Sequence, residues 1–233
     1  MDVARALGEA GAAEGLCVVA DEQTAGRGRL GRAWYSPRGS ALYASLLLRP
    51  ELPAARGGWL SMLAALAVHD GVSALLRAAG FAPAPLTLKW PNDVLWSGRK
   101  VAGILMESTL AGEALERVII GVGLNVNTVF DEAPGDVRAR AISLREVVGR
   151  EIARDQALAA VLAGFETRYA AFRASPASPR DEYARRLSTL GTRVRIARGH
   201  ETIVGDAVWV DEDGSLRAQT DAGIVSVAFG DVE

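Results

Sequence analysis

The chain is poor in the residues on which disulfide and zinc chemistry depend. Its 233 residues include one cysteine, Cys17, and two histidines, His69 and His200. A single cysteine excludes a disulfide framework and a cysteine-based metal cluster. The two histidines lie far apart in the sequence, and no His-Glu-x-x-His motif is present. These absences argue against a zinc enzyme and against catalysis that depends on histidine as acid or base.

A strong excess of one charge and a long hydrophobic run are also missing. The formal net charge is −2 and the sequence pI is about 5.8, which speaks against a dedicated nucleic-acid-binding protein. With 49% hydrophobic and 23% charged residues, the chain is not of the disordered class. The longest apolar run, residues 59–68, is shorter than the roughly 20 residues that a membrane span needs. We therefore expect a cytoplasmic protein that binds neither membrane nor nucleic acid.

Hydrophobic periodicity and turn residues predict an α+β fold. Strands are expected at residues 16–20, 42–48, 86–90, 94–96, 101–107 and 117–127. Helices are expected at residues 3–10, 58–79 with a kink near Gly71, 142–148, 157–172 and 180–187. This mixture suggests a mixed β-sheet with helices packed on one face.

The last forty or so residues have a different pattern. Short β-rich segments at 194–196, 207–210 and 224–227 are separated by turn signals at 213–214 and 221–223. They predict a small β-barrel of the size of an SH3 domain. We therefore expect two domains, a larger one over residues 1–190 and a small β domain over residues 191–233.

A glycine- and arginine-rich segment, Gln-Thr-Ala-Gly-Arg-Gly-Arg-Leu-Gly-Arg at residues 23–32, is the first candidate for chemistry. Its glycines fit Gly-x-Gly-x-x-Gly, but Pro37 and Gly39 oppose the helix that a dinucleotide-binding fold requires. A Walker A motif is excluded because Arg32-Ala33 stand where Lys-Ser/Thr is needed. What remains is a loop whose arginines are able to bind phosphate or carboxylate, or else a solvated basic loop.

Three further segments carry polar residues or glycines in or next to expected strands. Lys-Trp-Pro-Asn-Asp at residues 89–93 places a cation and a carboxylate around a turn, where Asp93 is able to hold Mg²⁺ or simply shape the turn. In residues 99–107 and 120–127, period two puts Gly103 with Leu105, and Gly121 with Gly123, on one strand face. Bare glycines inside strands suit either a flat ligand on the sheet or close helix packing.

Together, these four segments in this order resemble the biotin protein ligases, and the resemblance extends over essentially the whole chain. It implies the fold of those enzymes, which is related to class II aminoacyl-tRNA synthetases, with a small C-terminal domain. It also implies an ATP-dependent, AMP-forming ligase. Such an enzyme activates biotin to biotinyl-5′-AMP and transfers biotin to a lysine of a biotin carboxyl carrier protein, such as a subunit of acetyl-CoA carboxylase. ATP and Mg²⁺ are the implied cofactors, and a homodimer is an expectation.

The resemblance also assigns roles to individual residues. The implied catalytic residues are Lys100, which bridges the biotin carboxylate and the phosphate, with Arg29 and Lys89. The nucleotide and Mg²⁺ side is assigned to Asn92, Asp93 and Asn125, with Asp93 as the metal ligand. The implied substrate-binding residues are Gln23, Gly26, Arg27, Gly28, Arg29, Arg32, Trp34, Tyr43, Lys100, Gly103, Leu105, Gly121, Gly123 and Asn125. A mobile Gly-rich loop that orders over the acyl-adenylate would exclude water.

Two features of the chain differ from the family pattern. The Ser/Thr-Thr-Asn segment that usually precedes the first helix has no counterpart before Met1-Asp2-Val3, and the chain stops at Glu233, just after the Gly-Asp-Val step. No helix-turn-helix segment precedes the first helix either, so we expect a monofunctional enzyme without a DNA-binding domain. The alternatives are a lipoate or octanoate ligase or transferase of the same fold, an inactive biotin or nucleotide sensor, and a nucleic-acid-binding module.

Overall fold

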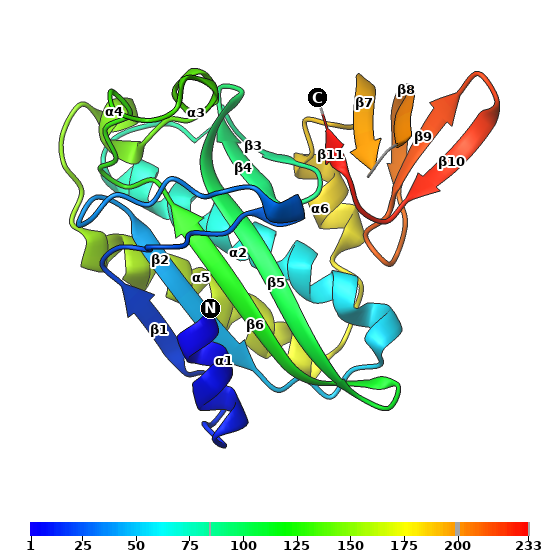
Figure 1. Cartoon of the computed structure of the whole chain (residues 1–233), viewed down its shortest axis with the longest axis horizontal. Coiled ribbons are helices and arrows are strands. Elements are labelled where there is room, and N and C mark those ends of the chain that lie inside the picture. Colours follow the sequence, from blue (N-terminus) through cyan, green and yellow to red (C-terminus); the bar gives the residue numbers. More distant parts are fainter. Residues whose placement is uncertain (84, 199–200, 233) are drawn as a thin grey trace.

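The computed structural model describes residues 1–83, 85–198 and 201–232, in which helices cover a large β-sheet and a smaller sheet lies to one side (Figure 1). His200 lies outside the described residues. The large sheet has the order β1-β2-β6-β5-β4-β3. Its strands are β1 (Cys17–Ala20), β2 (Leu42–Leu48), β3 (Leu86–Lys89), β4 (Asp93–Trp96), β5 (Arg99–Ala111) and β6 (Ala114–Leu124).

The α+β class is confirmed, but the large sheet is not mixed. Every pair of neighbouring strands in it is antiparallel. Parallel contacts among the described residues are isolated bridges, such as that between Leu88 and Leu187. The physical reason is that β3 to β6 follow one another through short turns, and antiparallel strands need no crossover connection. The long β5–β6 hairpin that results forms the centre of the sheet.

The long helices cover one face of this sheet. They are α2 (Gly57–Ala78) and α5 (Arg154–Ala174), with α6 (Arg180–Arg186) beside α2. Alternate residues of the central strands, such as Leu42, Ile104 and Leu124, enter the common core with them. The short helix α1 (Asp2–Glu9) is an exception to our expectation that helices pack on one face. It lies on the opposite face, where Gly8 lies against Leu47, and Figure 1 shows it in front of the strands.

Helix α2 runs without the kink that we expected near Gly71. A Cβ at Gly71 would lie 2.8 Å from the carbonyl oxygen of Ala160 in α5, and one at Gly164 would lie 2.7 Å from that of Ala67. The two glycines therefore serve the close approach of two helices rather than a bend. By length and composition the segment Ala54–Ala78 could cross a membrane, but 67% of its apolar window is buried inside the protein. It is the core helix of the fold.

The second sheet has the order β10-β9-β8-β7-β11 and is antiparallel throughout. Its strands are β7 (Arg193–Arg198), β8 (Glu201–Val210), β9 (Leu216–Thr220), β10 (Gly223–Val227) and β11 (Asp231–Val232). We expected a barrel, but β10 and β11 are the two edges and do not pair with each other among the described residues. Strand β9 has no counterpart in the sequence prediction, because Leu-Arg-Ala-Gln-Thr lacks a run of β-branched residues.

The turn between β8 and β9 fixes the second sheet to the first. The indole Nε1 of Trp59 donates to the Glu212 carbonyl at 2.7 Å, and that of Trp90 donates to the Gly214 carbonyl at 2.8 Å. Gly58 leaves no room for a side chain, since its Cβ would lie 1.8 Å from the Asp213 carbonyl oxygen. Because Trp90 directly follows β3 and leads into residues 91–93, this contact also holds that segment in place.

The remaining elements connect these layers. They are the short helices η1 (Arg29–Gly31), η2 (Ala54–Arg56), α3 (Gly135–Arg140) and α4 (Leu144–Val148). The sequence predicts a helix from residue 142, but α4 begins at Leu144 because Ser143 caps it. The Ser143 hydroxyl accepts from the Glu146 amide, and the Glu146 carboxylate accepts from the Ser143 amide, which is a capping box.

Candidate active site

A cavity of about 330 Å³ lies on the face of the large sheet that α2 and α5 leave uncovered. Its floor consists of two rows of residues that run across β5, β6 and β2. In the first row Gly103 is paired with Gly123, and Gly123 with Tyr43. In the second row Leu105 is paired with Gly121, and Gly121 with Ser45. The strand face that the sequence predicts is therefore present. Its four predicted positions, Gly103, Leu105, Gly121 and Gly123, are neighbours on the floor. Ser45, which the sequence analysis missed, follows from the same period-two rule applied to Tyr43.

The roof of this cavity is the loop of residues 21–39. The loop turns back on itself, because the Gly28 amide donates to the Arg32 carbonyl at 2.7 Å and the Trp34 amide donates to the Gly26 carbonyl at 2.9 Å. At its tip Leu30 has a φ of 54° and Gly31 a φ of 74°. Gly28 lines the cavity, as predicted. Gly26 does not: a Cβ there would lie 2.5 Å from Ser36 Oγ, so its role is packing within the loop.

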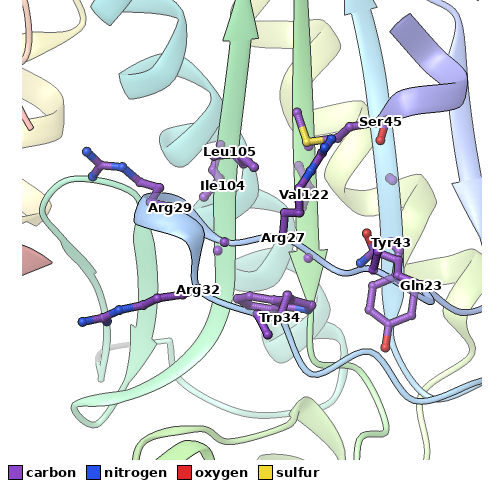
Figure 2. Close-up of a pocket in the computed structure, with 18 of the residues that line it drawn as sticks. Gln23, Arg27, Arg29, Arg32, Trp34, Tyr43, Ser45, Ile104, Leu105 and Val122 are labelled. Carbon is purple, nitrogen blue, oxygen red and sulfur yellow. The ribbon is translucent and has the colours of Figure 1, made fainter. Parts of the chain in front are cut away.

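Trp34 and Met1 lie directly on the glycine floor. A Cβ at Gly103 would be 2.8 Å, and one at Gly123 2.7 Å, from the Trp34 ring, while a Cβ at Gly121 would be 2.7 Å from the Met1 sulfur. Figure 2 shows the indole of Trp34 lying flat over β5 and β6. At Gly103 and Gly123 a larger residue would displace the Trp34 ring, whereas at Gly121 the flexible Met1 side chain has room to move aside.

The cations of the loop point in two directions. In Figure 2 the side chains of Arg29 and Arg32 extend away from Trp34 and β6, while Arg27 runs along the floor. All three line the cavity. The guanidinium of Arg27 lies 2.7 Å from Asp2 Oδ1 and 3.3 Å from Glu107 Oε1, so it is paired with carboxylates in this structure. The loop thus spreads the three arginines along the length of the cavity.

Lys100 lies at the inner end of the cavity with Asp93 and Trp34. Its Nζ is 2.6 Å from Asp93 Oδ1 and 4.9 Å from the centroid of the Trp34 ring. The Lys100 side chain is 30% exposed and that of Asp93 is 21% exposed. The carboxylate on one side and the aromatic face on the other fix the position of the Lys100 ammonium.

A second cavity, of about 240 Å³, adjoins the first and shares Arg32, Ala33, Trp34, Asp93 and Lys100 with it. The further lining residues, which the sequence analysis missed except for Lys89 and Asn125, come mainly from the segment around α3. They include Lys89, Asn125, Phe130, Asp136, Val137 and Arg140. The two cavities therefore meet at Lys100.

Lys89 and Asn125 both line the second cavity, in different ways. Lys89 lies on β3, at the far edge of the sheet, and lines the second cavity but not the first. Asn125 is 4% exposed, and its side-chain amide donates to the carbonyls of Lys100 at 3.2 Å and Ile142 at 3.3 Å. It thus holds the backbone at Lys100. Asn92 is used in a similar way, since its amide donates to the Ile104 carbonyl at 2.5 Å.

Gln23 and Tyr43 form the other end of the first cavity (Figure 2). The Gln23 amide donates to Ser36 Oγ at 3.1 Å, which ties the start of the loop to its end. The Tyr43 hydroxyl donates to the Pro37 carbonyl at 3.0 Å. Burial raises the pKa of Tyr43 to about 12, so this side chain is a neutral wall and a hydrogen-bond donor rather than a base.

The geometry agrees with what comparison with known proteins finds. Residues 4–125 match the biotin/lipoate A/B protein ligase family, and residues 189–233 match the biotin protein ligase C-terminal domain. The bifunctional ligase/repressor BirA of Bacillus spizizenii is 37% identical over 234 residues, which cover 99% of this chain and 69% of that protein. The chain belongs to the biotin protein ligases.

Two further comparisons place this ligase within the family. The biotin–[acetyl-CoA-carboxylase] ligase of Mycobacterium tuberculosis is 37% identical over 221 residues, which cover 94% of this chain and 79% of that one. The biotin protein ligase from Aquifex aeolicus, solved in complex with biotin and ATP, matches with a TM-score of 0.76 at 31% identity. That match covers 98% of this chain and 92% of the other. The likeness extends over both sheets, so the resemblance drawn from the four sequence segments is confirmed.

Proposed function

We propose that this ligase joins biotin to ATP, forming biotinyl-5′-AMP and pyrophosphate, and then transfers the biotinyl group to a lysine of a biotin carboxyl carrier protein. The observation that carries the proposal is the pair of adjoining cavities that meet at Lys100. We assign biotin to the first cavity, over the glycine floor, and the nucleotide to the second. The carboxylate of one substrate then meets the α-phosphate of the other beside the Lys100 ammonium.

The first step brings together two groups of like charge. Two unit charges 4 Å apart repel each other by about 4 kcal/mol at an effective dielectric constant of 20. Lys100 offsets this repulsion because it is already in place and adds no reorganisation cost as charge develops. A carboxylate oxygen attacks the α-phosphorus and the bond to pyrophosphate breaks. Arg32, which lines both cavities, and Arg29, which lines the first, are the further cations that we assign to the phosphates.

The second step requires that the intermediate survive until the acceptor arrives. An acyl-adenylate is a mixed anhydride that water hydrolyses. The loop of residues 21–39 and the indole of Trp34 cover the floor of the first cavity. They would therefore keep water away from an intermediate bound there. The acceptor amine then attacks the biotinyl carbonyl carbon, an amide bond forms and AMP leaves with the electron pair of the broken anhydride bond.

Magnesium is the cofactor that we infer with the nucleotide. The described residues hold no cluster of three or more carboxylate, histidine or cysteine ligands. Mg²⁺ is commonly bound through one or two carboxylates together with substrate phosphates. Asp93, which lines both cavities and whose Oδ1 lies 2.6 Å from the Lys100 ammonium, fits as such a single carboxylate. When bound, the ion would neutralise charge on the phosphates.

The remaining parts of the proposal concern organisation and partners. We assign residues 1–190 to the catalytic domain and residues 191–233 to a second domain that supports residues 91–93 through its β8–β9 turn. We place the protein in the cytoplasm, with a carboxylase subunit as its acceptor. Among the described residues, β1 and β3 form the two outer edges of the large sheet, and we assign the homodimer contact to the β1 edge.

The lipoate alternative has less support, because the chain lacks the Arg-x-Ser/Thr-Gly-Gly-Gly type of loop. The deciding experiment is ATP–pyrophosphate exchange with the purified protein. We expect exchange that depends on biotin and is absent with lipoate or octanoate. Exchange with lipoate alone, or no exchange with either acid, would overturn the proposed function.

A further inference from the structure

Four charged side chains form a cluster beside the first cavity: Asp2 and Arg27 line that cavity, and Arg5 and Glu107 line a small neighbouring one. Arg27 comes from the loop, Asp2 and Arg5 from α1, and Glu107 from β5. Arg27 contacts Asp2 at 2.7 Å and Glu107 at 3.3 Å. Arg5 contacts Asp2 at 3.1 Å and also pairs with Glu107. The two cations and two carboxylates thus alternate in a closed ring that joins three separate elements.

Glu107 is the member of this ring that the sheet holds in place. It lies two residues beyond Leu105 on the same strand face, opposite Ile119 of β6, and so stands just past the floor of the first cavity, in the small neighbouring one. Its side chain is 30% exposed, whereas that of Asp2 is 68% exposed. A carboxylate on a central strand has little freedom, while Arg27 belongs to a loop. The pairing therefore anchors the loop to the floor rather than the reverse.

We propose that Glu107 is a positioning residue that holds Arg27, and through it the loop of residues 23–32, closed over the glycine floor. The ring fixes the Arg27 side chain along the floor, where Figure 2 shows it extending from the loop past Val122 towards Ser45. The inference rests on the proposed function only for the identity of the ligand beneath the loop. Loss of the Glu107 charge should open the loop and weaken ligand binding, while the reaction at Lys100 is left unchanged.

The first test needs no ligand. Trypsin cleaves after Arg29 and Arg32, and the rate of each cut in the unliganded protein reports how often the loop opens. Because partly exposed ion pairs contribute modest energies, Glu107→Gln should raise both rates by about three- to fivefold. The matched control is Glu116→Gln, the same change on β6, where Glu116 pairs with the adjacent Arg117 and no effect is expected. Arg27→Gln should act like Glu107→Gln without a change in the sheet.

The second test separates positioning from general damage. In biotin-dependent exchange, Glu107→Gln should raise the KM for biotin by about three- to fivefold, because open loops bind ligand poorly, and leave kcat within about twofold. In an Arg27→Gln background, Glu107→Gln should change neither the cleavage rates nor KM. Wild-type cleavage rates in Glu107→Gln, or equal effects with and without Arg27, would overturn the positioning role. If the wild type shows no exchange but the cleavage rates change as expected, the proposed function is overturned and the positioning role of Glu107 stands.

Discussion

Replacement of Lys100 tests the chemistry of this site most sharply. The ammonium lies where the two cavities meet, 2.6 Å from Asp93 and over the face of Trp34. Lys100→Met keeps most of the length and packing of the side chain and removes the charge. We expect the adenylation rate to fall while the fold persists, because the side chain is 30% exposed and its backbone contacts are unaffected.

The size of the loss follows from the charges that the site has to bring together. A carboxylate and an α-phosphate about 4 Å apart repel by about 4 kcal/mol at an effective dielectric constant of 20, and a cation between them offsets an amount of that order. Partial exposure and the nearby arginines reduce what one lysine contributes. A loss of about 1.4 to 4 kcal/mol of barrier stabilisation remains, which corresponds to a rate reduced by about tenfold to a thousandfold.

The assay is the single-turnover rate of biotinyl-5′-AMP formation at saturating biotin and ATP. Lys100→Arg is the companion variant, because it retains charge with a different shape and should lose less. Lys89→Met changes the other lysine of the chain and should raise the KM for ATP more than it lowers this rate, since Lys89 lines the second cavity alone. If Lys100→Met keeps more than about a third of the wild-type rate, the charge argument is refuted.

Three other predictions concern the floor, acid stability and the contact between the sheets. Gly123→Ala should displace Trp34, whose ring lies 2.7 Å from the new Cβ, and weaken biotin binding by at least about tenfold in titration calorimetry; unchanged affinity would contradict the floor assignment. Hydrogen bonds from two arginines lower the pKa of Glu182 from 4.5 to about 2, so its stabilising effect is complete above pH 4.5 and is lost as the pH falls towards 2. Urea unfolding should therefore show a steeper acid loss for the wild type than for Glu182→Gln, and parallel curves would count against this ion-pair cluster. Gly58→Ala should cost about 1–3 kcal/mol of unfolding free energy, because its Cβ would meet the β8–β9 turn at 1.8 Å. The control is Gly135→Ala, which has open space around it. Equal unfolding free energies for the two variants would disprove the close contact.

Much of the fold is encoded in local signals. Strand β2 has the predicted bounds, Leu42–Leu48, because its apolar run ends at Arg49-Pro50. The glycine rows on β5 and β6 follow from period two alone, since neighbouring strands in register place their bare faces together. Helix α3 was missed because Gly-Asp-Val-Arg-Ala-Arg is short and has no helical stripe of apolar residues. Its position depends on contacts made elsewhere in the chain.

The site itself was predictable as a set of residues but not as a geometry. Arg27 finds its carboxylates 25 residues away, at Asp2, and 80 residues away, at Glu107, and no local pattern reports such partners. The resemblance names Lys89 beside Lys100 as a catalytic residue, but it does not say where Lys89 lies. Lys89 lies at the edge of the sheet, because β4 separates β3 from β5. Strand order is a non-local property, and it divides the site into two cavities.

The most direct test of the central claim, that two adjoining cavities form one active centre joined at Lys100, is competition binding with a non-hydrolysable analogue of biotinyl-5′-AMP. The account predicts one molecule bound per chain, displacement of both biotin and ATP, and an affinity far above that of either substrate. An analogue that displaces biotin but not ATP, or ATP but not biotin, would show that the two cavities do not act as one site.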